Sequence, residues 1–549
     1  MTPKTFLENF GHMAGTPGAV KRLRELILQL AVQGKLVPQD PNDEPASELL
    51  KKIMEEKARL VREGKIRVPK PLPPIKPEEV PFEVPEGWEW VLLGNMGELI
   101  NGDRSKNYPN RNEYVDSGVP WINTGHIDPD GSLNMGRMNF ITWEKFDSLR
   151  SGKIYPGDLV YCLRGTIGKT AMVDPLKEGA IASSLMIIRP YRPYVQRFLY
   201  QYLTSSLGRS QIFRFDNGSA QPNLSANSVR SYFFPLPPFE EQRRIVERVD
   251  QLMALCDRLE ERETEVSTTH QALTRSALHA LTTADGPHTF QTAWCRIRDH
   301  FDPLFITPES VKALRQTILQ LAVQGKLVPQ DPSDEPASVL LKKIAVEKAR
   351  LVREGKIRKS EPLPPIKPEE VPFEVPKGWE LVRYETLFYL ISPGKNKVKT
   401  SIINDTGAVP VIDQGQTFIS GYIDDPDLAI SIPGPVIVFG DHTCNIKYVD
   451  FDFVAGADGI KILRPLSLDE RFFYMLTRSI SIENRGYGRH YSRLLSNLAT
   501  IPPLAEQRRI VSRVDQLMAL CDRLEGQLRQ AQTEGAQLME AAVHHLSAA

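Results

Sequence analysis

The chain has 549 residues, and its 68 Lys and Arg residues balance 68 Asp and Glu residues, so the formal net charge is zero at pH 7. This length predicts several domains, and the charge balance means that any basic surface for a nucleic acid must be local. Five cysteines without a CxxC pair argue against a disulfide framework or a zinc site. The sequence shows neither a signal peptide nor an apolar run of about 18 residues, so we expect a soluble, cytoplasmic protein.

Two blocks of sequence each occur twice. Block A contains ILQLAVQGKLVPQDP at Ile27–Pro41 and again at Ile318–Pro332, an offset of 291 (318 − 27). Block B contains PPFEEQRRIVERVDQLMALCDRLE from Pro237 and PPLAEQRRIVSRVDQLMALCDRLE from Pro502, an offset of 265 (502 − 237). The chain therefore has the order A, insert 1, B, A, insert 2, B. A repeated frame of this kind predicts two copies of one partner.

Block A predicts two helices and an extended strap in each copy. An apolar helix follows the capping pairs Thr16-Pro17 and Thr307-Pro308, and a second helix with the sequence SELLKKIMEEKARLVREGK ends at Gly64. Seven prolines between positions 69 and 85 then exclude a helix and favour an extended conformation. We expect this strap to fix where the insert begins.

The two inserts predict mixed, strand-rich domains, because short apolar runs alternate with Gly, Pro, Asn and Asp. Their sequences differ, yet VPWINTG in insert 1 resembles VPVIDQG in insert 2, and YPGDLVYCLRGTIGK resembles IPGPVIVFGDHTCNIK. We therefore expect one fold with two different surface chemistries.

Block B predicts a long helix that packs as a coiled coil, because apolar residues recur every seven positions over several heptads. In the first copy this seam consists of Ile245, Leu252, Leu259, Val266 and Leu273, with Val249 and Cys256 between them. In the second copy it consists of Ile510, Leu517, Leu524, Ala531 and Leu538, with Val514, Cys521 and Leu528 between them. Glu263 and His270 interrupt the first seam, so we expect that helix to change partner or bend there.

The predicted fold class is α+β, with two strand-rich domains separated by long antiparallel coiled-coil helices. The expected boundaries are 1–87 for the first helices and strap, 88–236 for insert 1, 237–378 for the central helical region, 379–501 for insert 2 and 502–549 for the last helix. If the first block A packs on the last block B, the chain closes into a pseudo-two-fold cyclic arrangement.

Several predicted loops of the inserts combine cations with amides and hydroxyls. Cations bind phosphates, while Arg, Asn, Gln and His can pair with base edges, so these clusters predict DNA contacts. In insert 1 the candidates are Arg104, Lys106, Asn107, Arg111, Arg164, Thr166, Lys169, Arg214, Asn217, Gln221 and Asn223. In insert 2 they are Lys395, Lys397, Lys399, Gln414, His442, Thr443, Lys447, Arg485, Tyr487, Arg489, His490 and Arg493.

Three catalytic or metal motifs are excluded. Gly168-Lys169-Thr170 ends like a phosphate-binding loop, but Arg164 stands where the required glycine would be. Pro237-Pro238-Phe239 resembles a motif of amino-methyltransferases, but Leu236 replaces the polar residue that would hold the target amine. His442 and Cys444 lack metal-ligand spacing. The sequence therefore predicts neither catalysis nor a bound metal for this chain alone.

Two unlike domains that alternate with two near-identical helical regions resemble the DNA-specificity subunits of type I restriction-modification systems. The resemblance rests on both copies of blocks A and B, on GDLVYCLRGTIGK in insert 1 and on PVIVFGDHTCNIKYVDFDFVAGADGIKIL in insert 2. It covers the chain beyond the first fifteen residues.

The resemblance implies that each insert is a target-recognition domain for one half of a split, asymmetric DNA site, with the helices setting the length of the spacer. It also implies two methyltransferase subunits that methylate adenine with S-adenosylmethionine, and motor-nuclease subunits that use ATP and Mg²⁺. No cofactor on this chain and no membrane partner are expected. Two alternatives stay open: part of a fused restriction-modification enzyme, and a coiled-coil scaffold whose inserts bind proteins.

Overall fold

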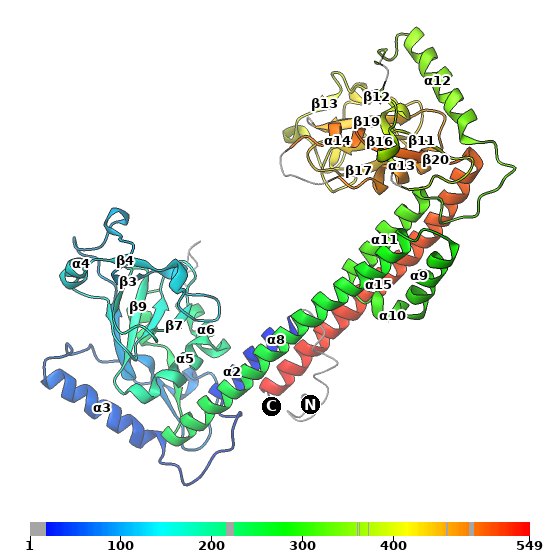
Figure 1. Cartoon of the computed structure of the whole chain (residues 1–549). Coiled ribbons are helices and arrows are strands. Elements are labelled where there is room, and N and C mark those ends of the chain that lie inside the picture. Colours follow the sequence, from blue (N-terminus) through cyan, green and yellow to red (C-terminus); the bar gives the residue numbers. More distant parts are fainter. Residues whose placement is uncertain are drawn as a thin grey trace. The chain divides into compact units, whose positions relative to one another are not determined.

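The computed structural model describes residues 18–215, 224–359, 361, 363–371, 373–456, 459–482 and 488–548, with side chains described up to residue 541. The chain divides into two compact units, unit 1 (Met1–Glu265 and Gln532–Ala549) and unit 2 (Val266–Ala531) (Figure 1). The long helices α8 (Phe239–Thr282) and α15 (Leu504–Ala548) each contribute to both units, and they pass from one unit to the other in opposite chain directions. The predicted antiparallel long helices are therefore present.

Each unit contains one copy of block A. Its helices are α2 (Ala19–Val32) and α3 (Ala46–Arg62) in unit 1, and α11 (Pro308–Val323) and α12 (Ala337–Arg353) in unit 2. The predicted cap of α11 is confirmed, because the Thr307 hydroxyl accepts a hydrogen bond of 3.1 Å from the backbone N–H of Ser310. Unit 2 also contains α9 (Pro287–Asp299) and α10 (Phe301–Leu304), which bury Ile297 and Leu304 in the same core as the end of α8.

The described residues of insert 1 form ten strands and four short α-helices. The strands are β1 (Glu89–Leu92), β2 (Gly97–Asn101), β3 (Val119–Ile122), β4 (Asn139–Ile141), β5 (Lys153–Ile154), β6 (Leu159–Cys162), β7 (Thr170–Met172), β8 (Gly179–Ile181), β9 (Leu185–Pro190) and β10 (Phe233–Leu236). The helices are α4 (Trp143–Ser148), α5 (Gln196–Thr204), α6 (Ser206–Phe213) and α7 (Ala226–Arg230). These bounds apply to the described residues.

Insert 2 has the same general composition. Its described strands are β11 (Glu380–Arg383), β12 (Phe388–Ile391), β13 (Lys397–Val398), β14 (Val409–Ile412), β15 (Gly421–Ile423), β16 (Val436–Gly440), β17 (Ile446–Val449), β18 (Val454–Gly456), β19 (Ile460–Pro465) and β20 (Leu498–Ile501). Its described helices are α13 (Glu470–Ser479) and α14 (Tyr491–Leu495).

The two inserts share a sheet plan. One sheet has the order β2-β9-β6-β7 in insert 1 and β12-β19-β16-β17 in insert 2. In the second sheet, β3 pairs parallel with β8 as β14 pairs parallel with β18, and β4 and β15 lie antiparallel beside them. The edge strands differ, because β5 is antiparallel to β8 whereas β13 is parallel to β18. The expectation of one fold is confirmed for these sheets.

Each block A packs on the block B that follows its own insert, and the contacts are repeated residue for residue. Arg24 lies 2.6 Å from Asp257 and 2.9 Å from Glu260, and at the corresponding positions Arg315 lies 2.7 Å from Asp522 and 3.1 Å from Glu525. The polypeptide between block A and block B therefore begins and ends at neighbouring points of the frame, which holds each insert at both ends.

The first block A also packs on the end of the last helix, so the predicted closure of the chain is confirmed. Arg22 donates a hydrogen bond of 2.7 Å to the carbonyl oxygen of Ala536, and Met539 is buried in the core that contains α2. At the centre of the sequence, the second block A also contacts the end of α8, through different residues: Lys326 donates to the carbonyl oxygens of Thr282 and Ala284.

The predicted coiled-coil seam is correct in the first part of each long helix and wrong in the second. Ile245 and Ile510 are fully buried, but Val266, Leu273 and Leu538 are 57%, 59% and 64% exposed. Ala531 is exposed as well. In the second part of α8 the buried residues are Thr274, Leu278 and Leu281.

A change of partner explains the shift in α8. The ring of His270 lies 3.1 Å from the carbonyl oxygen of Leu304, and the hydroxyl of Thr274 donates to the same oxygen. The helix thus turns a different face toward its neighbours from about His270 onward, where the sequence predicts an interruption.

None of the described helices combines the length and the apolar run that crossing a bilayer requires.

Candidate nucleic-acid interface

Several loops of insert 1 meet at one end of its sheets, around the turn 182–184 between β8 and β9. The backbone N–H of Leu163 donates a hydrogen bond of 2.9 Å to the carbonyl oxygen of Ser184, and the hydroxyls of Ser184 and Thr124 lie 3.3 Å apart. Arg104 extends to the carbonyl oxygen of Ser183 at 3.5 Å. We name residues 102–111, 123–125, 163–169 and 182–184 together recognition edge 1.

A buried carboxylate fixes the start of this edge. Asp103 is 3% exposed and accepts hydrogen bonds of 2.6 Å from the backbone N–H groups of Ser105 and Arg150. Burial opposes ionisation, but these hydrogen bonds outweigh it and lower the pKa of Asp103. The loop that carries Arg104 and Lys106 is therefore organised before any ligand binds.

The exposed candidates on recognition edge 1 are mostly cations. Arg104, Lys106, Arg111, Arg164 and Thr166 are exposed, and Lys169 and Asn107 are half-buried. The side-chain amide of Asn107 donates to the carbonyl oxygen of Ser148 at 2.6 Å. The edge thus presents positive charge on loops whose backbone is fixed by hydrogen bonds.

Arg214 has a different setting, beside α6. Its guanidinium lies 3.7 Å from the ring centroid of Phe233 and donates to the side-chain oxygen of Gln211 at 2.7 Å. These contacts hold the side chain against its own domain, and its role as a DNA contact stays a prediction. Asn217, Gln221 and Asn223 lie outside the described residues.

The corresponding loops of insert 2 meet around Gln414. The carbonyl oxygen of Gln414 accepts hydrogen bonds from the hydroxyl of Thr443 and from the amide of Asn445, and its side-chain Oε1 accepts one of 3.3 Å from the backbone N–H of His442. The hairpin between β16 and β17 therefore closes on the turn that follows β14. We name residues 392–399, 413–417, 440–447, 459 and 488–493 together recognition edge 2.

Asp441 connects three segments of recognition edge 2. This residue is 4% exposed, and its carboxylate accepts hydrogen bonds of 2.9 Å and 2.8 Å from the backbone N–H groups of His490 and Tyr491. Its own N–H donates to the carbonyl oxygen of Gly459 at 2.6 Å. One buried side chain thus positions the segment that leads into α14.

The candidates of insert 2 divide into exposed and buried groups. Lys395, Lys397, Lys399 and Arg489 are exposed, and Gln414, His442, Thr443 and Arg493 are half-buried. The predicted contacts Arg485 and Tyr487 lie outside the described residues.

Lys447 and His490 are buried, with exposed fractions of 6% and 1%. Lys447 donates to the carbonyl oxygen of Thr417 at 2.6 Å and lies 3.4 Å from Asp413. Burial lowers the pKa of Lys447, although Asp413 opposes the shift. Both residues hold loops of the edge together in the free chain, and direct contact of either with DNA stays a prediction.

Residues that organise the edges but are missing from the sequence-based candidates include Thr124, Ser183, Ser184, Asp103 and Asp441. The signal that could have found the first was the shared pattern VPWINTG and VPVIDQG, which places Thr124 and Gln414 at matching positions. Asp441 sits in a run with other polar residues, and nothing in the sequence distinguishes its buried carboxylate from an exposed one.

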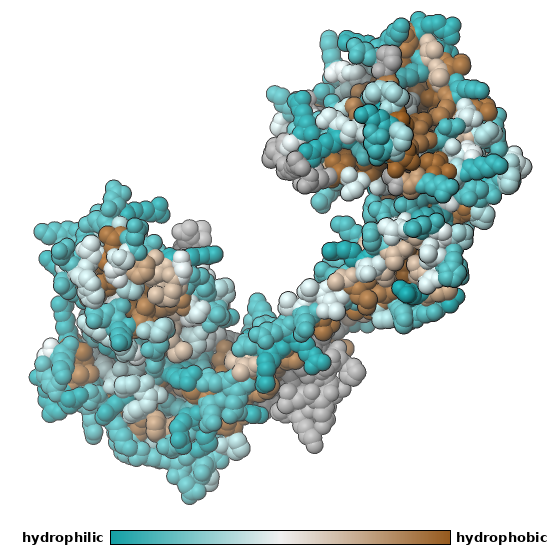
Figure 2. All heavy atoms as spheres, in the orientation of Figure 1, coloured by the Kyte–Doolittle hydropathy of each residue, from teal (hydrophilic) through white to brown (hydrophobic). Residues whose placement is uncertain are grey.

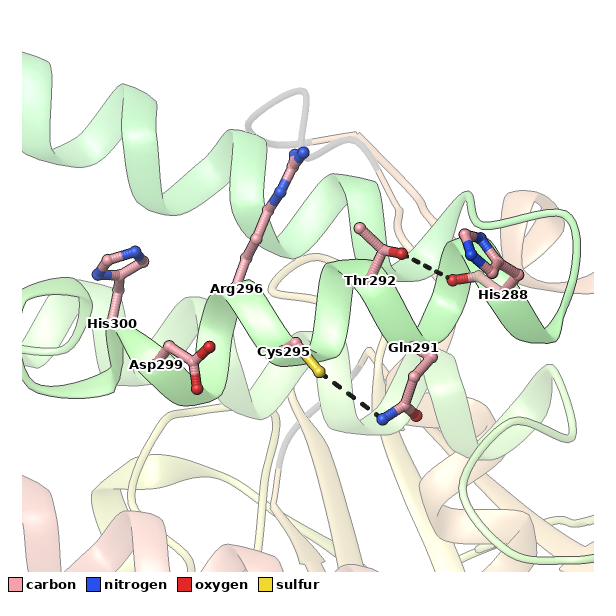
Figure 3. Close-up of a pocket in the computed structure, with 7 residues that line it drawn as sticks. All are labelled: His288, Gln291, Thr292, Cys295, Arg296, Asp299 and His300. Atoms are coloured by element: carbon pink, nitrogen blue, oxygen red, sulfur yellow. Dashed lines mark hydrogen bonds between the residues drawn. The ribbon is translucent and has the colours of Figure 1, made fainter.

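A shallow pocket of about 360 Å³ lies along α9, away from these loops in the sequence (Figure 3). Its lining comes from α9 and the residue that follows it: His288, Gln291, Thr292, Cys295, Arg296, Asp299 and His300. The two hydrogen bonds drawn join residues of the same helix, from Thr292 to His288 and from Gln291 to Cys295. In the described part of the chain, no group of three or more His, Cys, Asp and Glu side chains could hold a metal ion.

In the view of Figure 2, hydrophilic side chains cover much of both units, and hydrophobic residues also form a broad area on the drawn face of unit 2. Because the net charge of the chain is zero, the cations of the two edges are a local feature.

Comparison with known proteins identifies the family. The model of the type I restriction modification DNA specificity domain matches residues 85–267 and 376–532. The chain is 37% identical to the EcoAI specificity subunit of Escherichia coli over 92% of this chain and 90% of that one. It is 33% identical to the EcoEI specificity subunit of the same species over 95% and 93% of the two chains.

A solved structure supports the fold. A chain from a study of complex assembly and conformational transition in the type I R-M system aligns with a TM-score of 0.50 and 19% identity, over 85% of this chain and 99% of that one. The family model and the two relatives confirm the resemblance inferred from the repeated blocks. The chain belongs to the DNA-specificity subunits of type I restriction-modification systems.

Proposed function

We propose that recognition edges 1 and 2 each contact one half of a bipartite, asymmetric DNA site through the major groove. The observation that carries this proposal is that the two inserts share a sheet plan but present different side chains at their recognition edges. Edge 1 presents Arg104, Arg164 and Thr166, whereas edge 2 presents Lys395, Gln414 and His442. Two related domains with different contact residues favour two different half-sites, and thus a target that is not palindromic.

The proposed domain boundaries follow the frame. Insert 1 (88–236) and insert 2 (379–501) act as the target-recognition domains, and 1–87, 237–378 and 502–549 form the helical frame. In this proposal α8 and α15 set the spacing between the half-sites, since both helices contribute to both units.

The frame is proposed to dock two identical methyltransferase subunits. In support, an exposed stripe on block B is repeated without change: Arg248, Gln251, Leu255 and Arg258 in α8, and Arg513, Gln516, Leu520 and Arg523 in α15. Leu255 and Leu520 are 45% and 50% exposed, and each lies between polar residues of the same stripe. Identical exposed stripes suit two copies of one partner.

The remaining parts of the proposed complex belong to the partner subunits. S-adenosylmethionine would bind the methyltransferases, which methylate adenine, and ATP with Mg²⁺ would bind the motor-nuclease subunits. The whole assembly would act in the cytoplasm, where its DNA substrate lies.

A DNA-binding titration tests the proposal. The complex of this chain with its methyltransferase is titrated with duplex DNA between about 50 and 200 mM salt, where each neutralised phosphate contributes a slope of about −0.9 in log K against log salt. A steep fall in affinity is expected. Affinity that does not depend on salt would favour the scaffold alternative, in which the inserts bind proteins.

A labelling experiment separates this proposal from the fused-enzyme alternative. Radiolabelled S-adenosylmethionine and DNA are incubated with the pure chain and, in parallel, with the chain plus the methyltransferase. Label should enter DNA only in the second reaction. Incorporation by the pure chain would contradict the division of labour proposed above.

A further inference from the structure

The turn after the parallel strand of the second sheet is built alike in both inserts. In insert 1 the side-chain oxygen of Asn123 accepts a hydrogen bond of 2.8 Å from the N–H of Gly125, and in insert 2 the side-chain oxygen of Asp413 accepts one of 2.8 Å from Gly415. Such turns fix the residue between the two partners. That residue is Thr124 in insert 1 and Gln414 in insert 2.

The strands before these turns are also in matching register. Ile122 of β3 is paired with Ile181 of β8, and Ile412 of β14 is paired with Ala455 of β18, in both cases in parallel. Thr124 and Gln414 therefore lie at the same end of the corresponding sheets in the two inserts, each two residues after the last paired position of its strand.

Both side chains lie against the hairpin of the first sheet. A Cβ atom on Gly165 would lie 3.9 Å from the methyl group of Thr124, while Gln414 accepts a hydrogen bond from the backbone of His442. Gly459, with φ +100°, approaches Gln414 so closely that a Cβ atom there would lie 3.0 Å from Oε1. The glutamine is thus held in a tight, preformed setting at the centre of recognition edge 2.

The two side chains differ in what they can distinguish. A carboxamide offers one acceptor and one donor side by side, which matches N6 and N7 of adenine in the major groove. The bond from His442 occupies one of the two lone pairs of Oε1, so the second lone pair and the Nε2 donors can still contact a base. A threonine hydroxyl can donate or accept and discriminates less between bases.

We propose that position 414 and its counterpart 124 are equivalent specificity-determining positions, and that Gln414 recognises an adenine in the half-site of insert 2. This inference rests on the proposed function and assigns one base-pair contact within it. Thr124 occupies the same place in the half-site of insert 1 and recognises its base pair less strictly.

The test maps methylated adenines in the DNA of cells that carry the complete complex with wild-type chain, with Gln414→Ala or with Gln414→Glu. A bidentate contact contributes about 1–3 kcal/mol of discrimination, which corresponds to roughly 5- to 150-fold. Gln414→Ala should therefore reduce the preference for A·T at one position of one half-site by that factor. Gln414→Glu should shift the same position toward C·G, because a carboxylate accepts from cytosine N4.

Glu470→Gln is the control variant within insert 2. Glu470 follows the far end of β19, where it pairs with Arg464 at 3.0 Å, so its substitution should leave the methylation motif unchanged. Thr124→Gln provides a second variant and should sharpen the preference for A·T at one position of the other half-site.

Three outcomes would overturn the inference: an unchanged motif in both Gln414 variants, an even loss of methylation at every position, or a change in both half-sites. Failure of the proposed function looks different. In that case the wild-type complex itself yields no bipartite motif, whereas a bipartite motif that is insensitive to Gln414 contradicts only the assignment of this residue.

Discussion

Trp88 donates a hydrogen bond of 2.9 Å from its indole nitrogen to the carboxylate of Glu241, and Trp379 makes the same bond of 2.9 Å to Glu506. All four side chains are buried. Each tryptophan begins an insert and each glutamate lies in the helix that follows that insert. The bond therefore ties the start of the domain to its end, and it is one of the contacts that block A and block B repeat.

Removing this carboxylate should destabilise the frame. Glu241→Ala leaves the buried indole N–H of Trp88 without its acceptor, and an unsatisfied buried polar group costs about 1–3 kcal/mol. We expect a lower midpoint of thermal unfolding for the full-length chain, with Glu506→Ala giving a similar decrease. Unchanged midpoints in both variants would show that the tryptophan contact contributes little.

The same pair predicts a dependence on pH. Burial raises the pKa of Glu241 and of Glu506, although the hydrogen bonds from the tryptophans oppose the shift. A carboxyl whose pKa is raised by folding stabilises the fold below its ordinary, unfolded pKa of 4.5, and this contribution is lost as the pH rises through the folded pKa. The double variant Glu241→Gln/Glu506→Gln should therefore gain stability relative to wild type as the pH rises above about 4.5. A difference that is constant with pH would contradict the prediction.

The exposed ion pairs of the frame should matter less. Arg24 and Arg315 pair with Asp257 and Asp522, whose side chains are 63% and 70% exposed. Pairs of this kind contribute about 0.2–1 kcal/mol, because water screens the charges. Arg24→Ala and Arg315→Ala should each lower the unfolding midpoint by less than Glu241→Ala does. The reverse order, measured in the same buffer, would mean that the buried glutamates are not the main anchor.

The repeats and heptads of the sequence predict the frame well, because a duplicated block must fold alike and an apolar stripe must be covered. They fail for Val266 and Leu273, which follow the heptad but are exposed. The reason is that periodicity shows which residues share a face of a helix, whereas the position of neighbouring segments decides which face is covered. In α8 the segment near Leu304 covers the face of His270 and Thr274 instead.

The recognition edges could be predicted only in part. Exposed cations such as Arg164 and Lys399 are found by composition alone, because loops with clustered charge are recognisable. Lys447 has the same residue type, yet it is buried against Thr417. Asp441 escapes prediction because its partners are backbone N–H groups from a distant segment, and a sequence does not show such contacts.

Lysines of recognition edge 2 should contribute affinity without sequence preference. Lys395, Lys397 and Lys399 are exposed on one loop. Removing one phosphate contact makes the slope of log K against log salt shallower by about 0.9. The triple alanine variant of these lysines should bind all duplexes more weakly and with a shallower salt dependence. The matched control is the triple alanine variant of Lys51, Lys52 and Lys65, three exposed lysines of α3 and the turn after it. Lys57 of α3 contacts Asn95 at the start of the first sheet of insert 1, whereas edge 1 lies at the other end of that sheet. Equal effects of both variants would indicate a general loss of charge rather than contacts at the edge.

Asp441 should act on one half-site only. Asp441→Ala removes the acceptor for the N–H groups of His490 and Tyr491, so the segment before α14 loses its position and recognition by insert 2 weakens. Asp441→Asn keeps an acceptor oxygen in place and should restore most of the recognition. The measurement is the methylation of DNA sites that are altered in one half-site or in the other. If the asparagine variant behaved like the alanine variant, the charge rather than the geometry of the carboxylate would be responsible.

The exchange of one insert tests the central claim most directly. Residues 379–501 are replaced by the corresponding segment of a related specificity subunit, and the methylated adenines are mapped in cells that carry the hybrid chain with the methyltransferase. The account predicts a new bipartite motif in which the half-site of insert 1 is retained and only the other half differs. A motif altered in both halves would contradict it, as would a hybrid that assembles with the methyltransferase but retains the original motif.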